Sequence, residues 1–171
     1  MHTPFQNGPA VTFNEPIELL KACHGKVTRF SQDLLALPAY VAQHGVNAVV
    51  VAAITQIRHY FNLGAKLHHQ DEEVNLFPLL IKYAPHTQTQ VQALLCDHQR
   101  LDRAWQGVEA SLLQLLHQPH TDLSLLSAFA QAYADHIARE EPLFAVALDT
   151  IPAALLGNMG HLMAERRQQR P

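Results

Sequence analysis

The sequence contains one phrase of histidine and glutamate twice, each time at a spacing that suits an α-helix. The first copy runs from His68 to Phe77 and the second from His136 to Phe144. Both copies read H-x-x-x-E-E and are followed shortly by Leu-Phe. Because residues four apart lie on one face of a helix, each phrase can direct an imidazole and a carboxylate to a common point. Two such pairs on two helices predict two halves of one metal site.

Hydrophobic periodicity and helix-terminal residues predict four long helices and a short fifth helix. The expected spans are Pro16 to Pro38 or Tyr40, Asn47 to Lys82–Tyr83, after Thr87 to Leu115, Leu123 to Leu148, and Pro152 to Arg167. Pro78 is expected to kink or break the second helix. Short connections between consecutive long helices favour antiparallel neighbours. The predicted fold is therefore all-α, an up-down-up-down four-helix bundle over 15–167, with an N-terminal extension at 1–14 and a tail at 168–171.

Composition excludes several classes of protein. The chain has 171 residues and a formal net charge of -3, which argues against a nucleic-acid-binding protein. Its only basic cluster, Arg166–Arg167 with Arg170, is expected to be a solvated helix end. No stretch reaches the roughly 18 apolar residues of a membrane span, so no membrane contact is expected. No export signal is recognised, and Cys23 and Cys96 are expected to be buried thiols in a reducing cytoplasm.

Two further helices each supply one histidine on an apolar stripe. His24 lies four residues after Leu20, and His98 lies four residues after Leu94. A lone histidine on such a face is usually a hydrogen-bonded core residue, and a lone H-x-x-x-E is common as a surface helix pair. In combination, four imidazoles and two carboxylates buried without partners would cost several kcal/mol, and bound cations would remove that cost. The combination therefore predicts a metal site.

The donor set indicates which metal the site would hold. Four imidazoles and two carboxylates are too many for one tetrahedral zinc ion but suit two ions bridged by the glutamates, with positions left open for a small ligand. Mixed nitrogen and oxygen donors without thiolate favour iron, with manganese or zinc as substitutes. Carboxylate-rich di-iron bundles use Glu-x-x-His, whereas H-x-x-x-E is richer in nitrogen. We therefore expect reversible binding or mild redox chemistry rather than oxygenase chemistry.

On these residues the chain resembles the hemerythrin family, specifically the bacterial hemerythrin-like (HHE) cation-binding domains. The shared pattern is a histidine on the first helix, H-x-x-x-E-E-x-x-L-F-P on the second, a histidine on the third and H-x-x-x-E-E on the fourth. The resemblance covers about residues 15–167, including the ending Met163–Arg167. It implies a non-haem di-iron centre that binds dioxygen or senses iron and oxygen. The implied metal ligands are His24, His68, Glu72, His98, His136 and Glu140.

The chain departs from the family pattern on the third helix. Oxygen-carrying hemerythrins place a second histidine one turn after the third-helix histidine, and here that position is Asp102. Asp102 is expected to orient an imidazole, or alternatively to place its carboxylate near the metal. The absence of that histidine argues against simple oxygen storage.

Other residues near the two phrases leave two roles open. His69 is expected to form an exposed or interhelical pair with Glu73, and alternatively to supply an extra ligand or to gate access. Glu73 and Glu141 are expected to face solvent or to orient a ligand. Tyr133, one turn before His136, is expected to pack in the core, and alternatively to reach the metal centre.

Three functions compete. The leading hypothesis is a binding protein rather than an enzyme, which takes up dioxygen, another small diatomic molecule or an oxidant, or reports iron and oxidant levels. A stand-alone sensor of this kind would act through a protein partner or a homo-oligomer. The alternative is a peroxide- or nitric-oxide-consuming di-iron enzyme of oxidative stress defence, for which no acid–base residue beyond the ligands is apparent. The third hypothesis is a metal-free interaction bundle.

Overall fold

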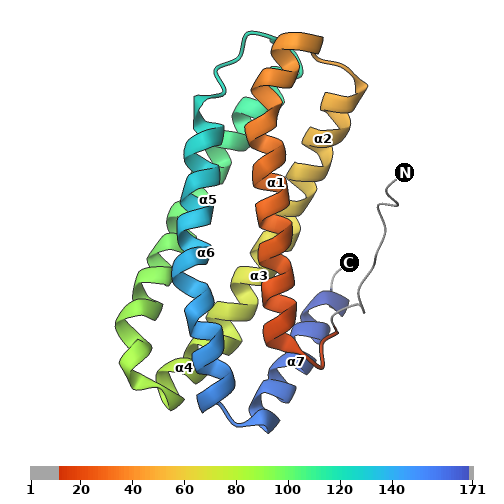
Figure 1. Cartoon of the computed structure of the whole chain (residues 1–171). Coiled ribbons are helices and arrows are strands. Elements are labelled where there is room, and N and C mark those ends of the chain that lie inside the picture. The colour runs from red at the N-terminus through yellow and green to blue at the C-terminus, as the bar shows by residue number, and fades with distance from the viewer. Residues whose placement is uncertain (1–11, 170–171) are drawn as a thin grey trace, which may run out of the picture.

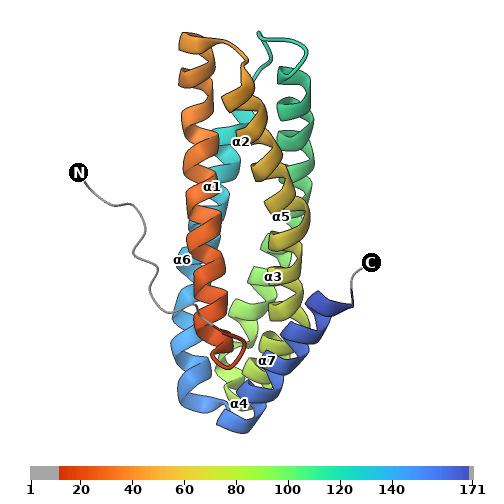
Figure 2. The same ribbon diagram turned by 90° about the vertical axis from the view of Figure 1, so that its right-hand side faces the viewer.

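The computed structural model describes residues 12–169, and these form helices and connections without any strand. The α-helices are α1 (Pro16–His44), α2 (Ala48–His59), α3 (Ala65–Asp71), α4 (Phe77–Tyr83), α5 (Gln88–Leu115), α6 (Ser124–Thr150) and α7 (Ala153–Gln168). The π-helical turns η1 (Tyr60–Gly64) and η2 (Glu72–Leu76) and the 3₁₀ turn η3 (Pro85–Thr87) complete the set. The long helical segments lie side by side, and α7 lies obliquely at one end of them (Figures 1 and 2). The all-α prediction is confirmed.

The predicted terminal segments fall largely outside the described range. Residues 1–11 of the predicted N-terminal extension and residues 170–171 of the predicted tail lie beyond it. Within 12–169, no helix combines the length and the hydropathy that crossing a bilayer requires.

The second long segment, from α2 to α4, is not one regular α-helix. The π-helical turns η1 and η2 interrupt it, and each closes its ring with one residue more than an α-turn. In η2 the Phe77 N–H bonds to the Glu72 carbonyl, five residues earlier. Pro78 follows in the first turn of α4, where its missing N–H costs little, so the interruption precedes the proline. Glu72, the first glutamate of the His68 phrase, is therefore the first residue of a π-turn.

The first helix is longer than the sequence indicates. Its predicted end near Pro38 or Tyr40 is wrong, because Pro38 lies inside α1, which continues to His44. Gly45 ends the helix with φ of 67°, a left-handed conformation that glycine adopts without steric cost. Asn47 then caps α2 by accepting hydrogen bonds from the N–H groups of its first turn at 3.0 and 3.2 Å.

Two apolar clusters fill the interior, and a polar layer lies between them. In α1, His24 falls between Leu20 of one cluster and Val27 of the other. The other three segments likewise place a histidine between residues of the two clusters, with Ala65, His68 and Leu76, with Leu94, His98 and Leu101, and with Tyr133, His136 and Leu143. The apolar clusters therefore cover both sides of the histidine layer and exclude water from it.

Two predictions about the outer residues are wrong. Arg166 and Arg167 of α7 do not form a solvated helix end, because both are partly buried and form ion pairs with the fully buried Asp71 of α3. Arg170, the third member of the predicted basic cluster, lies outside the described residues. Cys96 is exposed rather than buried, and Cys23 is partly buried.

Candidate metal centre

Seven buried side chains with metal-ligating atoms form two groups in the histidine layer between the apolar clusters. The first group contains His24, His68, Glu72 and Glu140, and the second contains His69, His98 and His136. Within each group the donor atoms lie within 4.8 Å of one another. No member of either group is more than 5% exposed. The structure thus brings together all six residues that the sequence nominated, and adds His69.

The local helix pairs form as the spacing predicts. His68 Nε2 lies 3.1 Å from Glu72 Oε1, and His136 Nε2 lies 3.3 Å from Glu140 Oε2. His24 reaches the same point from α1, with its Nε2 at 3.2 Å from Glu140 Oε2. Three segments that are distant in sequence therefore direct nitrogen and oxygen atoms to one point.

The two carboxylates of the first group also approach imidazoles of the second group. Glu72 Oε2 is 3.6 Å from His98 Nε2 in the second group, while its Oε1 faces His68 in the first. Glu140 likewise contacts His136 of the second group and His24 of the first through its Oε2. Because each carboxylate lies within reach of both sets of imidazoles, the arrangement suits glutamates that bridge two ions.

The second glutamate of each phrase holds a histidine from another helix. Glu141 Oε1 accepts from His24 Nδ1 at 3.1 Å, and Glu73 Oε1 accepts from His98 Nδ1 at 2.7 Å. A proton held on Nδ1 leaves Nε2 of each ring free to coordinate and fixes the orientation of the ring. The doubled glutamate in each phrase thus has a division of labour, with the first acid in the donor group and the second orienting an imidazole.

The phenylalanine of each phrase packs on the same histidine that its glutamate holds. The Phe144 ring stacks on His24 with centroids 5.3 Å apart, and the Phe77 ring stacks on His98 at 5.8 Å. The phenylalanine that follows each phrase therefore has a role at the centre, because it covers the lone imidazole of a neighbouring helix with apolar surface.

His69 lies inside the centre, which corrects the prediction of an exposed or interhelical pair with Glu73. Its ring stacks flat on His98, with centroids 3.8 Å apart and planes inclined by 7°. The hydroxyl of Tyr133 lies 3.4 Å from His69 Nε2. Tyr133 is therefore a core residue, as expected, and its hydroxyl is a neighbour of the second group.

Asp102 is exposed on α5 and belongs to neither group, so the expectation that it orients an imidazole or approaches the metal is wrong. A different acid on the same helix approaches a site histidine. Asp97 is buried, its Oδ2 lies 3.8 Å from His136 Nδ1, and the same oxygen pairs with Arg139 at 2.8 Å. Sequence reasoning missed Asp97 because its partners are on α6, and no local spacing links it to them.

Burial controls the protonation of the donors. Burial, and then the neighbouring Glu140 carboxylate, raises the pKa of Glu72 well above its ordinary value. Burial also opposes ionisation of Glu140, but hydrogen bonds from His136 and His24 outweigh it and hold the pKa of Glu140 below its ordinary value. Burial, followed by neighbouring imidazoles, lowers the pKa values of His68 and His69 well below 6.5. The two imidazoles are therefore neutral near pH 7, the form that coordinates metals.

Several buried polar atoms of the centre have no hydrogen-bond partner among the described residues. They are both carboxylate oxygens of Glu72, Oε1 of Glu140, and Nδ1 of His68 and His136. Buried polar atoms are nearly always paired, so a cluster of unpaired ones indicates a missing partner. Cations would supply that partner for the carboxylate oxygens, and the nitrogen and oxygen donors fit the ions that such a site prefers.

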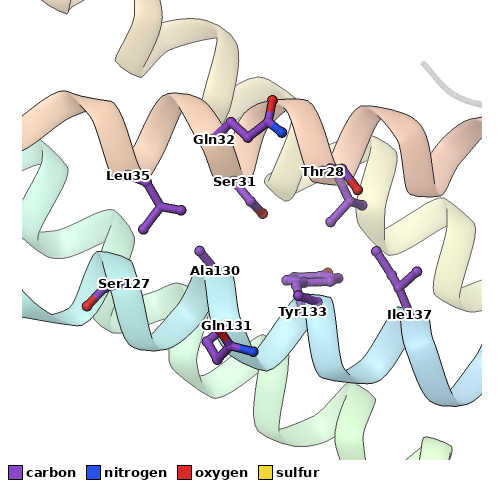
Figure 3. A pocket seen from close by; sticks show the side chains of 11 residues that line it. Thr28, Ser31, Gln32, Leu35, Ser127, Ala130, Gln131, Tyr133 and Ile137 are labelled. Carbon is purple, nitrogen blue, oxygen red and sulfur yellow. The ribbon is translucent and has the colours of Figure 1, made fainter.

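A groove lies beside the centre, between α1 and α6 (Figure 3). It has a volume of about 290 Å³ and is lined by aliphatic and uncharged polar side chains together with Tyr133. Ser31 points from α1 into the groove, and its buried hydroxyl has no partner among the described residues. Tyr133 forms part of the opposite wall, and its hydroxyl contacts His69. Tyr133 therefore connects the wall of the groove to the second histidine group.

Comparison with known proteins agrees with this geometry. The hemerythrin HHE cation-binding domain matches residues 15–148. The chain is also 43% identical over 159 residues to an uncharacterized protein of Haemophilus influenzae, and the match covers 92% of each chain. The matched domain contains both donor groups and the residues that orient them. The chain thus belongs to the hemerythrin HHE cation-binding domain family.

Proposed function

We propose that this protein is a non-haem di-iron protein that reversibly binds dioxygen or a related small oxidant, or reports its presence. One ion would be held by His24 and His68, and the other by His69, His98 and His136. Glu72 and Glu140 would bridge the two ions. Iron would supply the redox change on ligand binding, with manganese or zinc as substitutes. We also infer that the bundle has the up-down-up-down order, because the connections between its long segments are short.

The observation that carries this proposal is the set of unpaired oxygens on the central carboxylates, which are both oxygens of Glu72 and Oε1 of Glu140. Glu72 is completely buried, and neither of its oxygens has a hydrogen-bond partner among residues 12–169. A structural histidine–glutamate cluster would satisfy those atoms with donors from the protein. A pair of cations satisfies them and explains why five imidazoles gather around two carboxylates.

His69 removes the main objection that the sequence raised. The family position for a further third-helix histidine is occupied by Asp102, which is exposed. His69, from α3, brings a third imidazole to the second donor group in its place. Oxygen binding is therefore compatible with the donor set, although the extra histidine comes from a different helix.

The test is metal analysis with anaerobic spectroscopy. Protein loaded with ferrous iron under argon should hold two ions per chain and should develop a ligand-to-metal charge-transfer band on exposure to air, which should fade on removal of oxygen. His69→Gln should lower the stoichiometry, whereas His117→Gln, which changes an exposed histidine, should not. Protein that retains well under one ion per chain would support the metal-free bundle instead.

Tyr133 gives a specific reason to consider the enzymatic alternative. Burial raises the pKa of Tyr133 well above its ordinary value, so its hydroxyl stays protonated and can donate beside His69. It also borders the groove through which a small molecule could approach. Turnover of peroxide or nitric oxide that is lost in Tyr133→Phe, with metal content unchanged, would support an enzyme of oxidative stress defence. Stoichiometric oxidation without turnover would support the binding protein.

The partners and location follow from the same proposal. A protein that reports an oxidant must pass the signal to a protein partner or through a homo-oligomer. The thiols Cys23 and Cys96 are both free, which is compatible with the reducing cytoplasm expected from the sequence.

A further inference from the structure

We propose that α7 positions the metal centre through an ionic clamp, formed by Arg166 and Arg167 of α7 with Asp71 and Asn75 of the second segment. This inference rests on the proposed metal centre and adds positioning residues to it. None of the four clamp residues belongs to either donor group. Their effect on a metal would therefore be exerted through Glu72.

The clamp joins α7 to the second segment over more than ninety residues of sequence. Arg166 donates through Nη1 to Asp71 Oδ1 and through Nη2 to Asn75 Oδ1, the latter at 2.7 Å. Arg167 donates through Nη2 to Asp71 Oδ2 at 2.7 Å. Both oxygens of Asp71 are therefore paired, each with a different guanidinium group.

The clamp spans the junction at which Glu72 lies. Asp71 is the last residue of α3, and Asn75 belongs to the π-turn η2 that begins with Glu72. The guanidinium of Arg166 bonds to one residue on each side of Glu72, and so fixes the π-turn relative to α3. A π-turn is a rare local departure from the regular α-helix and is frequently found at functional sites. The direction of the Glu72 carboxylate follows from that turn.

Asp71 makes the clamp obligatory for the folded second segment. Its side chain is 0% exposed, and a buried carboxylate without a partner costs several kcal/mol. The arginine side chains are 19% and 26% exposed, so water screens these pairs only weakly. Displacement of α7 would therefore leave a buried charge two residues from His69 and one residue from Glu72.

α7 is held in place independently of the clamp. A Cβ atom on Gly160 would lie 1.9 Å from the carbonyl oxygen of Phe13, so the helix approaches the chain before α1 as closely as glycine allows. Leu156, Met159 and Met163 of α7 are buried in the apolar cluster that also contains Ile17 and Leu20 of α1. α7 also lies outside residues 15–148, the part that matches the family.

Cobalt titration of the full chain tests the clamp. Co²⁺ would be titrated into metal-free protein in competition with a chelator, and the d–d absorption bands would report the geometry of its ligands. The double variant Arg166→Gln/Arg167→Gln should bind Co²⁺ about tenfold to hundredfold more weakly than wild type, with altered bands. Arg103→Gln, on the exposed face of α5, should match wild type.

Lysine variants separate positioning from charge. Arg167→Lys retains a positive charge beside Asp71 and should stay close to wild-type affinity. Arg166→Lys should remain weakened, because one ammonium group cannot reproduce the planar fork that reaches Asp71 and Asn75 together. Equal affinities of the two lysine variants would contradict the spanning role of Arg166.

Two more variants keep the test decisive if the double variant fails to fold. Asp71→Asn removes the buried charge together with the clamp. Gly160→Ala changes none of the clamp residues but forces α7 away from Phe13. Gly157→Ala, on the same helix with open space around it, is its control. Asp71→Asn and Gly160→Ala should weaken Co²⁺ binding, and Gly157→Ala should not.

The outcomes for the clamp and for the metal centre are distinguishable. Wild-type protein that binds fewer than two Co²⁺ ions would count against the proposed function. Wild-type protein that binds two, together with unchanged affinity and bands in Asp71→Asn and Gly160→Ala, would overturn the clamp alone. A lower unfolding temperature of the metal-free variants without a change in Co²⁺ affinity would likewise overturn it, because α7 would then be only a structural support.

Discussion

The division of labour within each Glu-Glu pair gives the sharpest prediction. Glu73 and Glu141 each accept the Nδ1 proton of an imidazole but belong to neither donor group. Substitution of either by glutamine keeps an oxygen acceptor of the same size and removes only the negative charge. The metal affinity of the imidazole should fall, because the ring loses the anion that makes its Nε2 a better donor.

The structure ranks the two effects. Loss of a partner that orients a metal ligand costs about tenfold to hundredfold in affinity. Both side chains are partly exposed, at 39% for Glu73 and 49% for Glu141, which places both in the lower half of that range. The contact of Glu73 is shorter, at 2.7 Å against 3.1 Å, so its Coulomb attraction is about 15% larger before screening. We expect Glu141→Gln to cost about tenfold, or about 1.4 kcal/mol, and Glu73→Gln about fifteenfold, or about 1.6 kcal/mol.

Chelator competition with Co²⁺ or Fe²⁺ under argon measures these affinities. Glu18→Gln on α1 is the matched control. The Glu18 side chain is 50% exposed, and its ion-pair partner is Lys21, which belongs to neither donor group. Glu141→Gln should weaken the ion near His24, and Glu73→Gln the ion near His98. Wild-type affinity in both variants, or a larger effect for Glu141→Gln, would refute the reasoning.

Three further predictions concern stability. Gly64→Ala should destabilise the protein by about 1–2 kcal/mol in urea unfolding, because the added methyl would lie 2.9 Å from two Tyr60 ring atoms. Gly25→Ala, in open space on α1, should instead stabilise it by about 0.5–1 kcal/mol. Equal effects of the two substitutions would contradict the packing of η1. Burial lowers the pKa values of His68 and His69, so below about pH 6.5 the unfolded chain binds protons that the folded chain does not. The free energy of unfolding of the metal-free protein should therefore decrease as the pH is lowered, by up to about 1.4 kcal/mol per pH unit for each imidazole. His69→Gln should make this decrease with falling pH less steep, and an unchanged pH dependence would argue against buried neutral imidazoles. Chelation of the metal should lower the unfolding temperature, which excess metal should restore, and a temperature independent of metal would argue against a native metal site.

Local spacing was sufficient for much of the centre. His68 with Glu72, and His136 with Glu140, lie four residues apart, and the helix geometry that joins them is independent of the rest of the fold. The apolar residues around His24 determine that its side chain faces inward, because a helix with one apolar face buries that face. These residues were predictable because their arguments involve only one helix at a time.

His69 shows where such reasoning ends. One residue from His68, it should point about 100° away on a regular α-helix, and its expected partner was Glu73. In the folded protein α5 and α6 also cover the face of α3 that carries His69, so His69 contacts His98 of α5 and Tyr133 of α6. Its environment depends on helices whose positions no local spacing specifies.

The sequence by itself determined the helices, the inward faces and the two histidine–glutamate pairs, since periodicity and i,i+4 neighbours are properties of a single segment. Only the tertiary structure decided which residues meet between segments. It paired Glu141 with His24 and Glu73 with His98, it left Asp102 at the surface, and it brought the arginines of α7 to Asp71. The physical reason is that these contacts depend on the relative position and rotation of packed helices, and on the π-turns that alter the phase of the second segment.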